Sequence, residues 1–456
     1  MTRPLRALLA TVPLVLWLTA ACGSDGKGPT VTTGSGGGDG TGGNVPAHPW
    51  DKPVCGEPDK PLGGTPATRS DTAGALNADA TEMVIFGGDS AKPMCPNIPP
   101  RIHEGDTWIL DVACGAWSEL SLPTAPSPRA RHSMAQDHAR NRALLFGGRF
   151  RPEGAPGTDP YTIYNDLWSF DFTAKTWTEI ATTGSPPSPR SNTSMVVVGD
   201  ELIVFGGNLG TSGINFVPSS DTYALNLVSN EWRQIATGAA PPSRLFHTMA
   251  ADEANGRVFI GTGGDENAFI GPFLTDYWVL DLATEQWAEI PTAPSFAPAE
   301  LQRIKAGLVY RPETEQGPAG LVAFAGHDNL TPFFDVRNDV RFLDLTGLTV
   351  PPAGPHPFGD IRVGDVYQTE LTDACSLPVD YVVTDLEAPE RRDGFAMGIA
   401  HGGGAFVVFA GNADCDRLSD AWWFNTATGE WTPIRESLAG ISCPRTGNPS
   451  CSDLCG

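Results

Sequence analysis

Several features that mark enzymes and nucleic-acid-binding proteins are missing from this chain of 456 residues. Basic residues are few: 30 Lys and Arg stand against 53 Asp and Glu, which leaves a net charge of −23. Binding to a phosphate backbone needs basic patches, so this balance excludes nucleic acid as an expected partner. The sequence also has no G-x-S-x-G elbow, no H-E-x-x-H, no P-loop and no G-x-G-x-x-G after a strand, and its eight histidines are scattered. We therefore name no catalytic residue and expect no cofactor.

Cysteine is missing from the middle of the chain, between Cys114 and Cys375. No paired C-x-x-C or Cys/His spacing occurs either, so no metal site is expected. Apart from Cys22, the chain has eight cysteines: Cys55, Cys95, Cys114, Cys375, Cys415, Cys443, Cys451 and Cys455. An even number in an exported chain favours disulfides, and their pairing stays open.

The N-terminal segment predicts export. Arg3 and Arg6 form a basic start before the apolar stretch 7–20, which is too short for a mature transmembrane helix. These features predict a signal peptide at 1–21.

The end of this segment, 18–22 (LTAAC), resembles the bacterial lipobox. The resemblance implies a lipoprotein signal peptide, lipidation of Cys22 and a membrane anchor, and an ordinary secretory signal is the alternative. Gly23, rather than Asp, after the cysteine favours an outer membrane or the cell surface over the cytoplasmic membrane. The Gly/Ser-rich composition of 22–48 predicts a flexible tether.

What the chain does contain is a sixfold repeat. In each copy an aspartate is followed five residues later by Asp or Asn, and in five copies a tryptophan comes six residues after that. The anchor positions are Asp106/Asp111/Trp117, Asp166/Asp171/Trp177, Asp221/Asn226/Trp232, Asp276/Asp281/Trp287, Asp339/Asp344 and Asp420/Asn425/Trp431. Upstream of each lies an apolar run that ends in small residues: MVIFGG (83–88), ALLFGG (143–148), LIVFGG (202–207), VFIGTGG (258–264), LVAFAG (321–326) and FVVFAG (406–411). Self-similarity at this period predicts a repeat fold.

Each copy is consistent with four strands separated by turns. In the second copy we expect these strands at 131–136, 143–146, 167–171 and 177–180. The run before the glycines is continuously apolar, which is typical of a strand buried on both faces, and helical periodicity is missing. The predicted fold class is all-β, with four antiparallel strands per repeat.

An apolar run ending in Gly-Gly, then an aromatic residue, then Trp at fixed spacing, in units of roughly 50 residues, resembles the Kelch repeat. The resemblance covers about 69–434 and implies a propeller of six blades, or of seven if the stretch 346–391 is a degenerate blade and not an insertion. The fifth copy departs from the pattern, since Arg341 and Val350 stand where the aromatic and the Trp belong. We expect the propeller to span 49–440, followed by a Cys-rich tail at 441–456.

In a closed ring the first and last repeats are neighbours, so the cysteines are expected to cluster at the seam between them. Some Kelch propellers are enzymes, including copper-radical oxidases and sialic-acid epimerases, and many others bind proteins. The fold alone does not choose between these classes.

A column of arginines begins the first strand of each copy: Arg69, Arg129, Arg190, Arg244, Arg303 and Arg392. Antiparallel pairing puts these arginines, the glycine pairs and the first aspartates of the anchors at one end of every blade. Repeated Arg–Asp ion pairs are one interpretation, and a ring of free arginines that binds an anion is the other. His132 and His247 occupy equivalent repeat positions, which favours packing over catalysis.

The residues directly after the small pairs are the candidate ligand-binding residues: Asp89, Arg149, Asn208, Asp265, His327 and Asn412. Long loops on the same face carry aromatic residues: Tyr161, Tyr164, Phe216, Phe269, Phe273, Phe333 and Phe334. Polar groups beside aromatic faces suit a glycan or a protein loop. The alternative is that the polar groups only cap strand ends and the aromatics pin the loops.

The predicted function is that of a membrane-anchored envelope protein that holds a protein or glycan partner on the long-loop face. One alternative is a carbohydrate-active Kelch enzyme (an epimerase, lyase or oxidase), with a carboxylate or His327 as acid/base. The other is a purely structural envelope component.

Overall fold

The computed structural model describes residues 50–91, 101–235, 238–268, 270–293, 302–315, 317–328, 336–367, 381–382, 387–413 and 417–437. All of them belong to one unit, His48–Gly456. The predicted signal peptide, tether and Cys-rich tail lie outside the described residues, and so do Cys22, Cys95, Cys375, Cys415, Cys443, Cys451 and Cys455. Within the described part, no helix combines the length and the apolar character that a membrane span requires.

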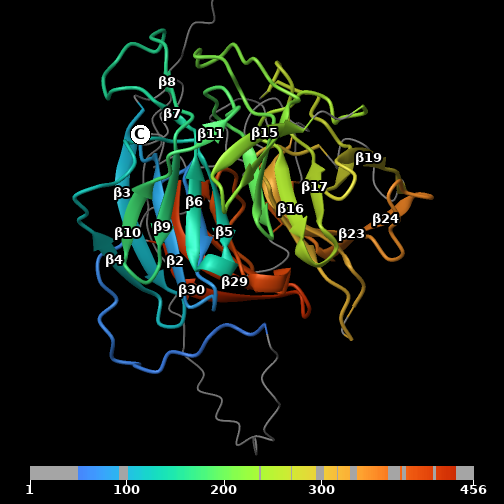
Figure 1. Cartoon of the computed structure of the whole chain (residues 1–456). Coiled ribbons are helices and arrows are strands. Elements are labelled where there is room, and N and C mark those ends of the chain that lie inside the picture. Colours follow the sequence, from blue (N-terminus) through green and yellow to red (C-terminus); the bar gives the residue numbers. More distant parts are fainter. Residues whose placement is uncertain are drawn as a thin grey trace, which may run out of the picture. The chain divides into compact units, whose positions relative to one another are not determined.

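The strands build a six-bladed β-propeller, in which each blade has four antiparallel strands (Figure 1). The first blade contains β1 (Ala73–Leu76), β2 (Glu82–Asp89), β3 (His103–Asp111) and β4 (Ala116–Leu120). The second contains β5 (Ser133–Asp137), β6 (Arg142–Phe146), β9 (Leu167–Asp171) and β10 (Thr176–Glu179). The third contains β12 (Ser194–Val198), β13 (Glu201–Phe205), β14 (Thr222–Asn226) and β15 (Glu231–Ile235).

The remaining blades follow the same order from the channel outward. The fourth contains β16 (Thr248–Asp252), β17 (Arg257–Gly261), β18 (Tyr277–Asp281) and β19 (Gln286–Ile290). The fifth contains β21 (Gly307–Arg311), β22 (Gly320–His327), β23 (Val336–Asp344) and β24 (His356–Arg362). The sixth contains β27 (Ala396–Ile399), β28 (Ala405–Asn412), β29 (Arg417–Asn425) and β30 (Glu430–Arg435).

Short strands decorate the blades. β11 (Thr183–Gly184) and β20 (Thr292–Ala293) pair in parallel with β15 and β24, on the outer edges of the third and fifth blades. Two small hairpins lie in connections: β7 (Arg149–Phe150) with β8 (Thr162–Ile163), and β25 (Val366–Tyr367) with β26 (Tyr381–Val382).

The core lies between the blades, because the second strand of each blade is buried on both faces. Val84 and Phe86 of β2, for example, pack with Leu145 and Trp177 of the second blade. The innermost strands surround a central channel with a cavity of about 610 Å³. We call the end with the long second-to-third-strand connections the upper face (top of Figure 1) and the opposite end, with the short turns, the lower face.

The fifth blade shows how a departure from the repeat is absorbed. Its fourth strand, β24, begins later than the pattern predicts, so part of the stretch 346–391 is a strand of this blade. Phe358 pairs with Leu343 in the register in which Trp177 pairs with Phe170 in the second blade. Phe358 is buried in the core and therefore fills the position of the repeat tryptophan.

A closed ring of backbone hydrogen bonds joins the six blades at the upper end of the channel. Each blade contributes one residue, located two positions after its column arginine, and its N–H donates to the carbonyl of the equivalent residue in the preceding blade. The six N···O distances are 2.7–3.3 Å, and every member has a left-handed φ of 53–59°. The ring residues are Asp71, Arg131, Asn192, Phe246, Lys305 and Gly394. Left-handed backbone costs a non-glycine residue roughly 1–2 kcal/mol, so the ring bonds between blades offset a repeated local strain.

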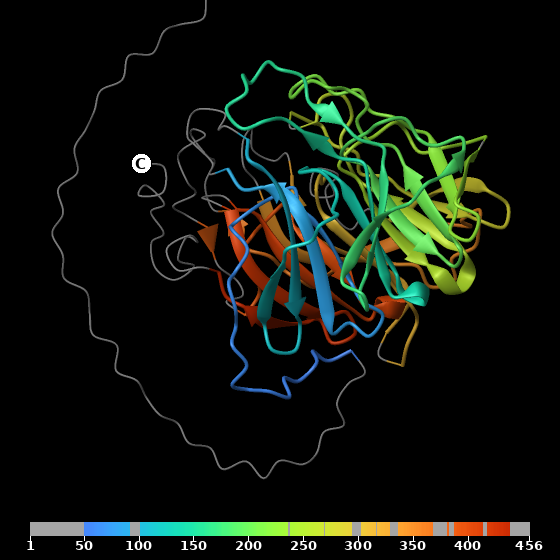
Figure 2. The same ribbon diagram turned by 60° about the vertical axis from the view of Figure 1, so that its left-hand side comes forward.

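At the seam between the first and last blades the described strands include none exchanged between the two, and Figure 2 shows these two blades side by side. The N-terminal segment crosses the seam instead. The carbonyl of Trp50 accepts a bond from Trp423 Nε1 in the sixth blade (3.0 Å), while Lys52 Nζ donates to the Ala113 carbonyl in the first (2.8 Å).

One disulfide lies within the described residues and joins Cys55 to Cys114. Cys114 is in the turn between β3 and β4, and a Cβ placed on the next residue, Gly115, would lie only 2.4 Å from the Ile434 carbonyl oxygen of the last blade. This disulfide therefore fastens the N-terminal segment beside the seam, where the cysteines were expected to cluster.

Candidate functional site

The column arginines are fully engaged, so the interpretation of free arginines that bind an anion is wrong. In the second blade Arg129 Nη1 and Nη2 donate to Asp166 Oδ1 and Oδ2 at 2.6 and 2.8 Å, and Nη1 also bonds the Gly147 carbonyl at 3.0 Å. The equivalent pairs are Arg69–Asp106, Arg190–Asp221, Arg244–Asp276, Arg303–Asp339 and Arg392–Asp420. We call these six pairs the Arg–Asp belt.

In four blades a tryptophan two residues after the belt aspartate donates a further hydrogen bond to that aspartate. Trp168 Nε1 donates to Asp166 Oδ2 at 2.8 Å. In the fifth blade, which lacks the aromatic, Arg341 Nε donates to Asp339 Oδ2 at 2.7 Å in the same way. Burial alone would raise the pKa of Asp166, but the hydrogen bonds and charge of Arg129 outweigh it and keep the pKa below its usual range.

The predicted ligand-binding residues lie on the upper face, in the connections after the second strands. Five of them form a backbone bridge to the residue after the column arginine, as Arg149 does with Ala130. The fourth blade is the exception, because there Gly264 makes that bridge and Thr262 and Gly263 take the place of the glycine pair. Asp265 therefore lies one position beyond the column, and that part of the alignment was wrong.

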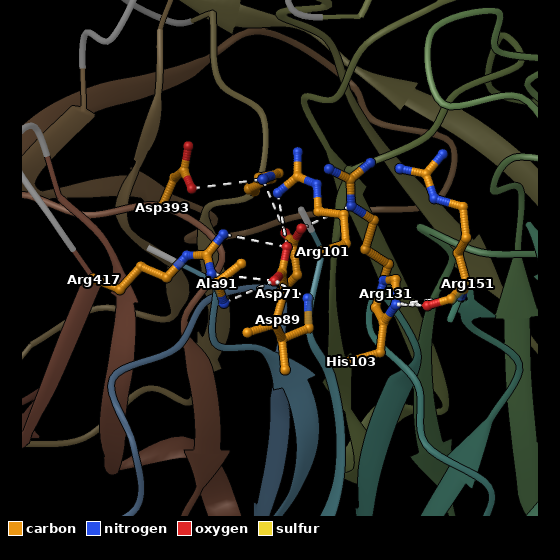
Figure 3. Close-up of polar contacts among 11 residues, drawn as sticks. Asp71, Asp89, Ala91, Arg101, His103, Arg131, Arg151, Asp393 and Arg417 are labelled. Carbon is orange, nitrogen blue, oxygen red and sulfur yellow. Dashed lines mark hydrogen bonds and ion pairs between the residues drawn. The ribbon is translucent and has the colours of Figure 1, made fainter. Parts of the chain in front are cut away.

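Three of these residues use their side chains to stabilise local structure. The Asn208 amide bonds the backbone of Gly210 and Val217 and caps its own loop. Asp265 Oδ1 accepts the Asn267 N–H at 2.7 Å. Asp89 accepts from Arg101 at 2.7 Å and from Arg417 at 3.1 and 3.2 Å, and thereby ties the first blade to the last (Figure 3).

The pKa of Asp89 is set mainly by the neighbouring charges. Its burial would raise the pKa, but Arg417 and Arg101 outweigh that effect and lower it. His327 is buried at the end of β22, and burial lowers its pKa. Asn412 is only partly buried, and its backbone bridges to Asp393.

Arg149 differs from every belt arginine. It is buried, with 2% of its surface exposed, yet Nε and Nη1 have no hydrogen-bond partner among the residues that the structure describes. The guanidinium stacks on the Tyr161 ring, 3.9 Å from its centroid. Burial, followed by repulsion from Arg131, holds the pKa of Arg149 well below its usual range. An anion beside Arg149 would relieve both effects.

The sequence did not reveal the other charged groups at this mouth. Figure 3 shows Arg101, Arg131 and Arg151 together at the upper end of the channel, beside Asp71 and Asp89. Arg131 Nε and Lys305 Nζ pair with Asp71 at 2.8 and 2.9 Å. Asp71, Arg131 and Lys305 are members of the backbone ring, which has no common residue type that could have predicted them.

The loop aromatics mostly support the loops. Tyr161 is buried against Arg149 and Arg151, whose guanidinium carbons lie 3.9 and 4.4 Å from its ring centroid. Phe216 and Phe273 belong to a small apolar cluster above the ring. The Tyr164 ring covers Arg129, whose guanidinium carbon lies 4.0 Å from the ring centroid. The remaining loop aromatics, Phe269, Phe333 and Phe334, lie outside the described residues.

Comparison with known proteins agrees with this architecture. Residues 80–309 match the KLHDC2/KLHL20/DRC7 Kelch-repeats domain. The chain is similar to Adagio protein 3 of Arabidopsis thaliana (32% identical over 180 residues, 38% of this chain and 25% of that protein). It is similar to Kelch domain-containing protein 10 of Homo sapiens (30% over 172 residues, 36% of each chain) and to Adagio-like protein 1 of Oryza sativa (28% over 283 residues, 61% of this chain and 37% of that protein).

The matched parts thus cover little more than a third, at most, of these three relatives' own lengths. The likeness is to Kelch-repeat proteins and does not extend to the whole activity of any relative. The chain belongs to the Kelch-repeat family.

Proposed function

We propose that the protein binds a protein partner on its upper face and that Arg149 receives an acidic group of that partner. The observation that carries the proposal is a buried guanidinium whose Nε and Nη1 lack hydrogen-bond partners within the described part of the chain. A buried charge without a counter-ion is costly, and a carboxylate or phosphate that reaches it gains a charge-assisted, bidentate bond. Although the chain as a whole is strongly acidic, the basic side chains of Arg101, Arg131 and Arg151 gather at this mouth (Figure 3).

Apolar exposure on the same face favours a protein over a small anion. Within the described ranges, most of the exposed large hydrophobic residues lie in upper connections: Leu209, Ile214, Val217, Ile270 and Val363. Long loops on a rigid scaffold commonly carry binding residues, and apolar side chains beside an arginine are typical of protein interfaces. Many propellers of this family act as protein-binding scaffolds, which agrees with the proposal.

The test measures binding of the full chain to a peptide library with acidic members, a charge-matched basic library and a glycan array. We expect acidic peptides to bind, with an affinity that falls as salt rises. Arg149→Met should weaken that binding about 10- to 100-fold, because it removes the desolvated partner of the acid. Arg233→Met is the matched control, since Arg233 pairs with Glu201 and Glu285 on a different part of the surface.

Equal affinity in Arg149→Met would contradict the site assignment. Selective binding of a sugar that survives Arg149→Met would replace the protein partner with a glycan. Either result leaves the family and the fold untouched.

We further propose that the protein is exported and lipid-anchored through Cys22, as the lipobox resemblance implies. Supporting evidence is the tether-like composition of 22–48 and the Cys55–Cys114 disulfide, which fits an oxidising compartment. Expression in a bacterium with a radiolabelled fatty acid should label the wild-type chain. Cys22→Ala should abolish labelling and release the protein from the membrane fraction, and unchanged labelling would contradict the anchor.

A further inference from the structure

Three side chains from alternate blades lie together at the lower mouth of the channel. His138, Glu253 and His401 are each the first residue of a short 3₁₀ helix that follows an inner strand: η1 (His138–Arg140), η2 (Glu253–Asn255) and η3 (His401–Gly403). These helices belong to the second, fourth and sixth blades. Alternate blades of a six-bladed ring are a third of a turn apart, so equivalent positions converge on the axis. All three residues line the channel cavity, at the end opposite Asp71 and Lys305.

The distances between the three side chains suit a shared cation. One donor atom from each residue lies within 4.8 Å of the donors of the other two. The rings of His138 and His401 are 5.1 Å apart at their centroids and inclined by 73°, so they meet edge to face and do not stack flat. Donors around tetrahedral zinc lie about 3.3–3.6 Å apart, given bonds of about 2.0–2.2 Å. Glu253 and His401 are exposed, so small side-chain rotations can supply the remaining closure.

His138 already has the outer partner that metal-bound histidines commonly use. Its Nε2 lies 3.0 Å from the Ile399 carbonyl oxygen, while Nδ1 is buried and no described residue forms a hydrogen bond with it. When Nε2 donates its proton to that carbonyl, the lone pair is on Nδ1. A second-shell carbonyl that fixes the imidazole tautomer in this way is a regular feature of metal sites.

The neighbouring carboxylates are occupied elsewhere, which leaves Glu253 as the available acid. Asp137 pairs with Arg140 and Arg142. Asp252 bonds Asn255 and caps its own helix. The carboxylate of Glu253, by contrast, makes no hydrogen bond or ion pair with any residue that the structure describes. Nδ1 of His138 and the carboxylate of Glu253 are thus left without a hydrogen-bond partner among the described residues, next to the exposed imidazole of His401.

We propose that His138, Glu253 and His401 bind a divalent transition-metal ion, with zinc as the best match. Two histidines and one glutamate form a common zinc ligand set, and they leave a fourth position for water or a further ligand. Bound metal would link three alternate blades at the lower mouth. The site is independent of the proposed partner site, which lies at the other end of the channel.

The test uses the full chain, freed of metal by a chelator, and measures zinc affinity by competition with a chromophoric chelator. We expect one tightly bound zinc per chain in the wild type. Glu253→Gln and His401→Ala should each weaken it at least 10-fold, and cobalt(II) should give visible absorption bands typical of low coordination number in the wild type only. Both variants change exposed residues, and circular dichroism checks that they fold.

Glu313→Gln is the matched control, because Glu313 is an exposed acid in the first-to-second-strand turn of the fifth blade. It should bind zinc like the wild type. Cysteines are the same in every variant, so any zinc held by thiols cannot produce the expected difference. Equal affinity in a double variant, Glu253→Gln with His401→Ala, or no binding by the wild type, would overturn the proposal.

Discussion

Two buried arginines of the second blade, twenty positions apart in the chain, have opposite surroundings. Arg129 belongs to the Arg–Asp belt and has a bidentate carboxylate and a carbonyl oxygen as partners. Arg149, at the mouth of the channel, lies on the Tyr161 ring, and no described residue accepts a hydrogen bond from its Nε or Nη1. Both are buried, so burial alone does not distinguish a structural arginine from one prepared for a ligand. What distinguishes them is whether the guanidinium has a carboxylate partner. By this criterion the upper face has a structural part, the Arg–Asp belt, and a binding part at the mouth of the channel.

The largest expected effect comes from breaking a belt pair. Asp166→Ala leaves the buried guanidinium of Arg129 without a counter-ion, which should lower the free energy of unfolding by about 3–5 kcal/mol. Urea unfolding followed by tryptophan fluorescence measures it. A loss below about 1 kcal/mol would mean that the belt contributes little to stability.

The second largest effect is expected from acid, which should lower the free energy of unfolding through two histidines beside the belt. His132 and His247 lie behind Arg129 and Arg244, and burial, aided by those arginines, lowers the pKa of each to about 3. An unfolded histidine binds a proton near pH 6.5, so between pH 6.5 and about 3 the unfolded state holds more protons, and stability falls as pH falls. Each histidine should contribute a slope of about 1.4 kcal/mol per pH unit.

The matched variant for this slope comes from the chain itself. Thr72 and Thr193 hold the equivalent position in the first and third blades, so His132→Thr should remove one histidine's share of the slope, about 1.4 kcal/mol per pH unit. The other histidines with lowered pKa values, His103, His138, His247 and His327, should keep their contributions. Belt aspartates, whose pKa values are lowered, should add their own loss only as pH falls below about 4. An unchanged slope in His132→Thr would show that the imidazole does not stay neutral in the fold.

The mouth should respond differently from the belt. Arg149→Met replaces an unpaired buried charge by an apolar side chain of similar length, and we expect the free energy of unfolding to stay constant or to rise by about 1–2 kcal/mol. Thermal unfolding without ligand checks this. A destabilisation as large as that of Asp166→Ala would place Arg149 among the structural arginines and remove the basis of the comparison.

The smallest effect is expected in the fifth blade. Arg341→Trp restores the residue that other blades use to donate to the belt aspartate, so stability should change by less than about 1 kcal/mol. Arg341→Ala, which removes the donor, should cost more. Equal free energies of unfolding in the two variants would show that the hydrogen bond to Asp339 does not contribute to stability.

Much of this arrangement could be predicted from the repeat. The Arg and Asp columns recur with the periodicity of the blades, and strand direction alone brings them to one end. The fifth blade was harder: its fourth strand shifts along the chain, and Phe358 fills a position that no spacing rule assigns to it. The alignment of Asp265 with the column was wrong by one residue. Thr262 adopts the left-handed conformation that the first glycine of the pair has in the first three blades, so the column residue of the fourth blade is Gly264.

The sequence by itself determined the fold class, the number of repeats and the Arg and Asp columns, because each rests on residue types that recur at fixed spacing. That the two columns pair with each other was decided by the tertiary structure. Only the tertiary structure decided the backbone ring, the unpaired state of Arg149 and the meeting of His138, Glu253 and His401. The ring is made by backbone groups, so any residue type can join it. The state of Arg149 and the meeting of His138, Glu253 and His401 depend on contacts between different blades. Such contacts join residues that are far apart in the sequence, so they produce no repeating pattern along it.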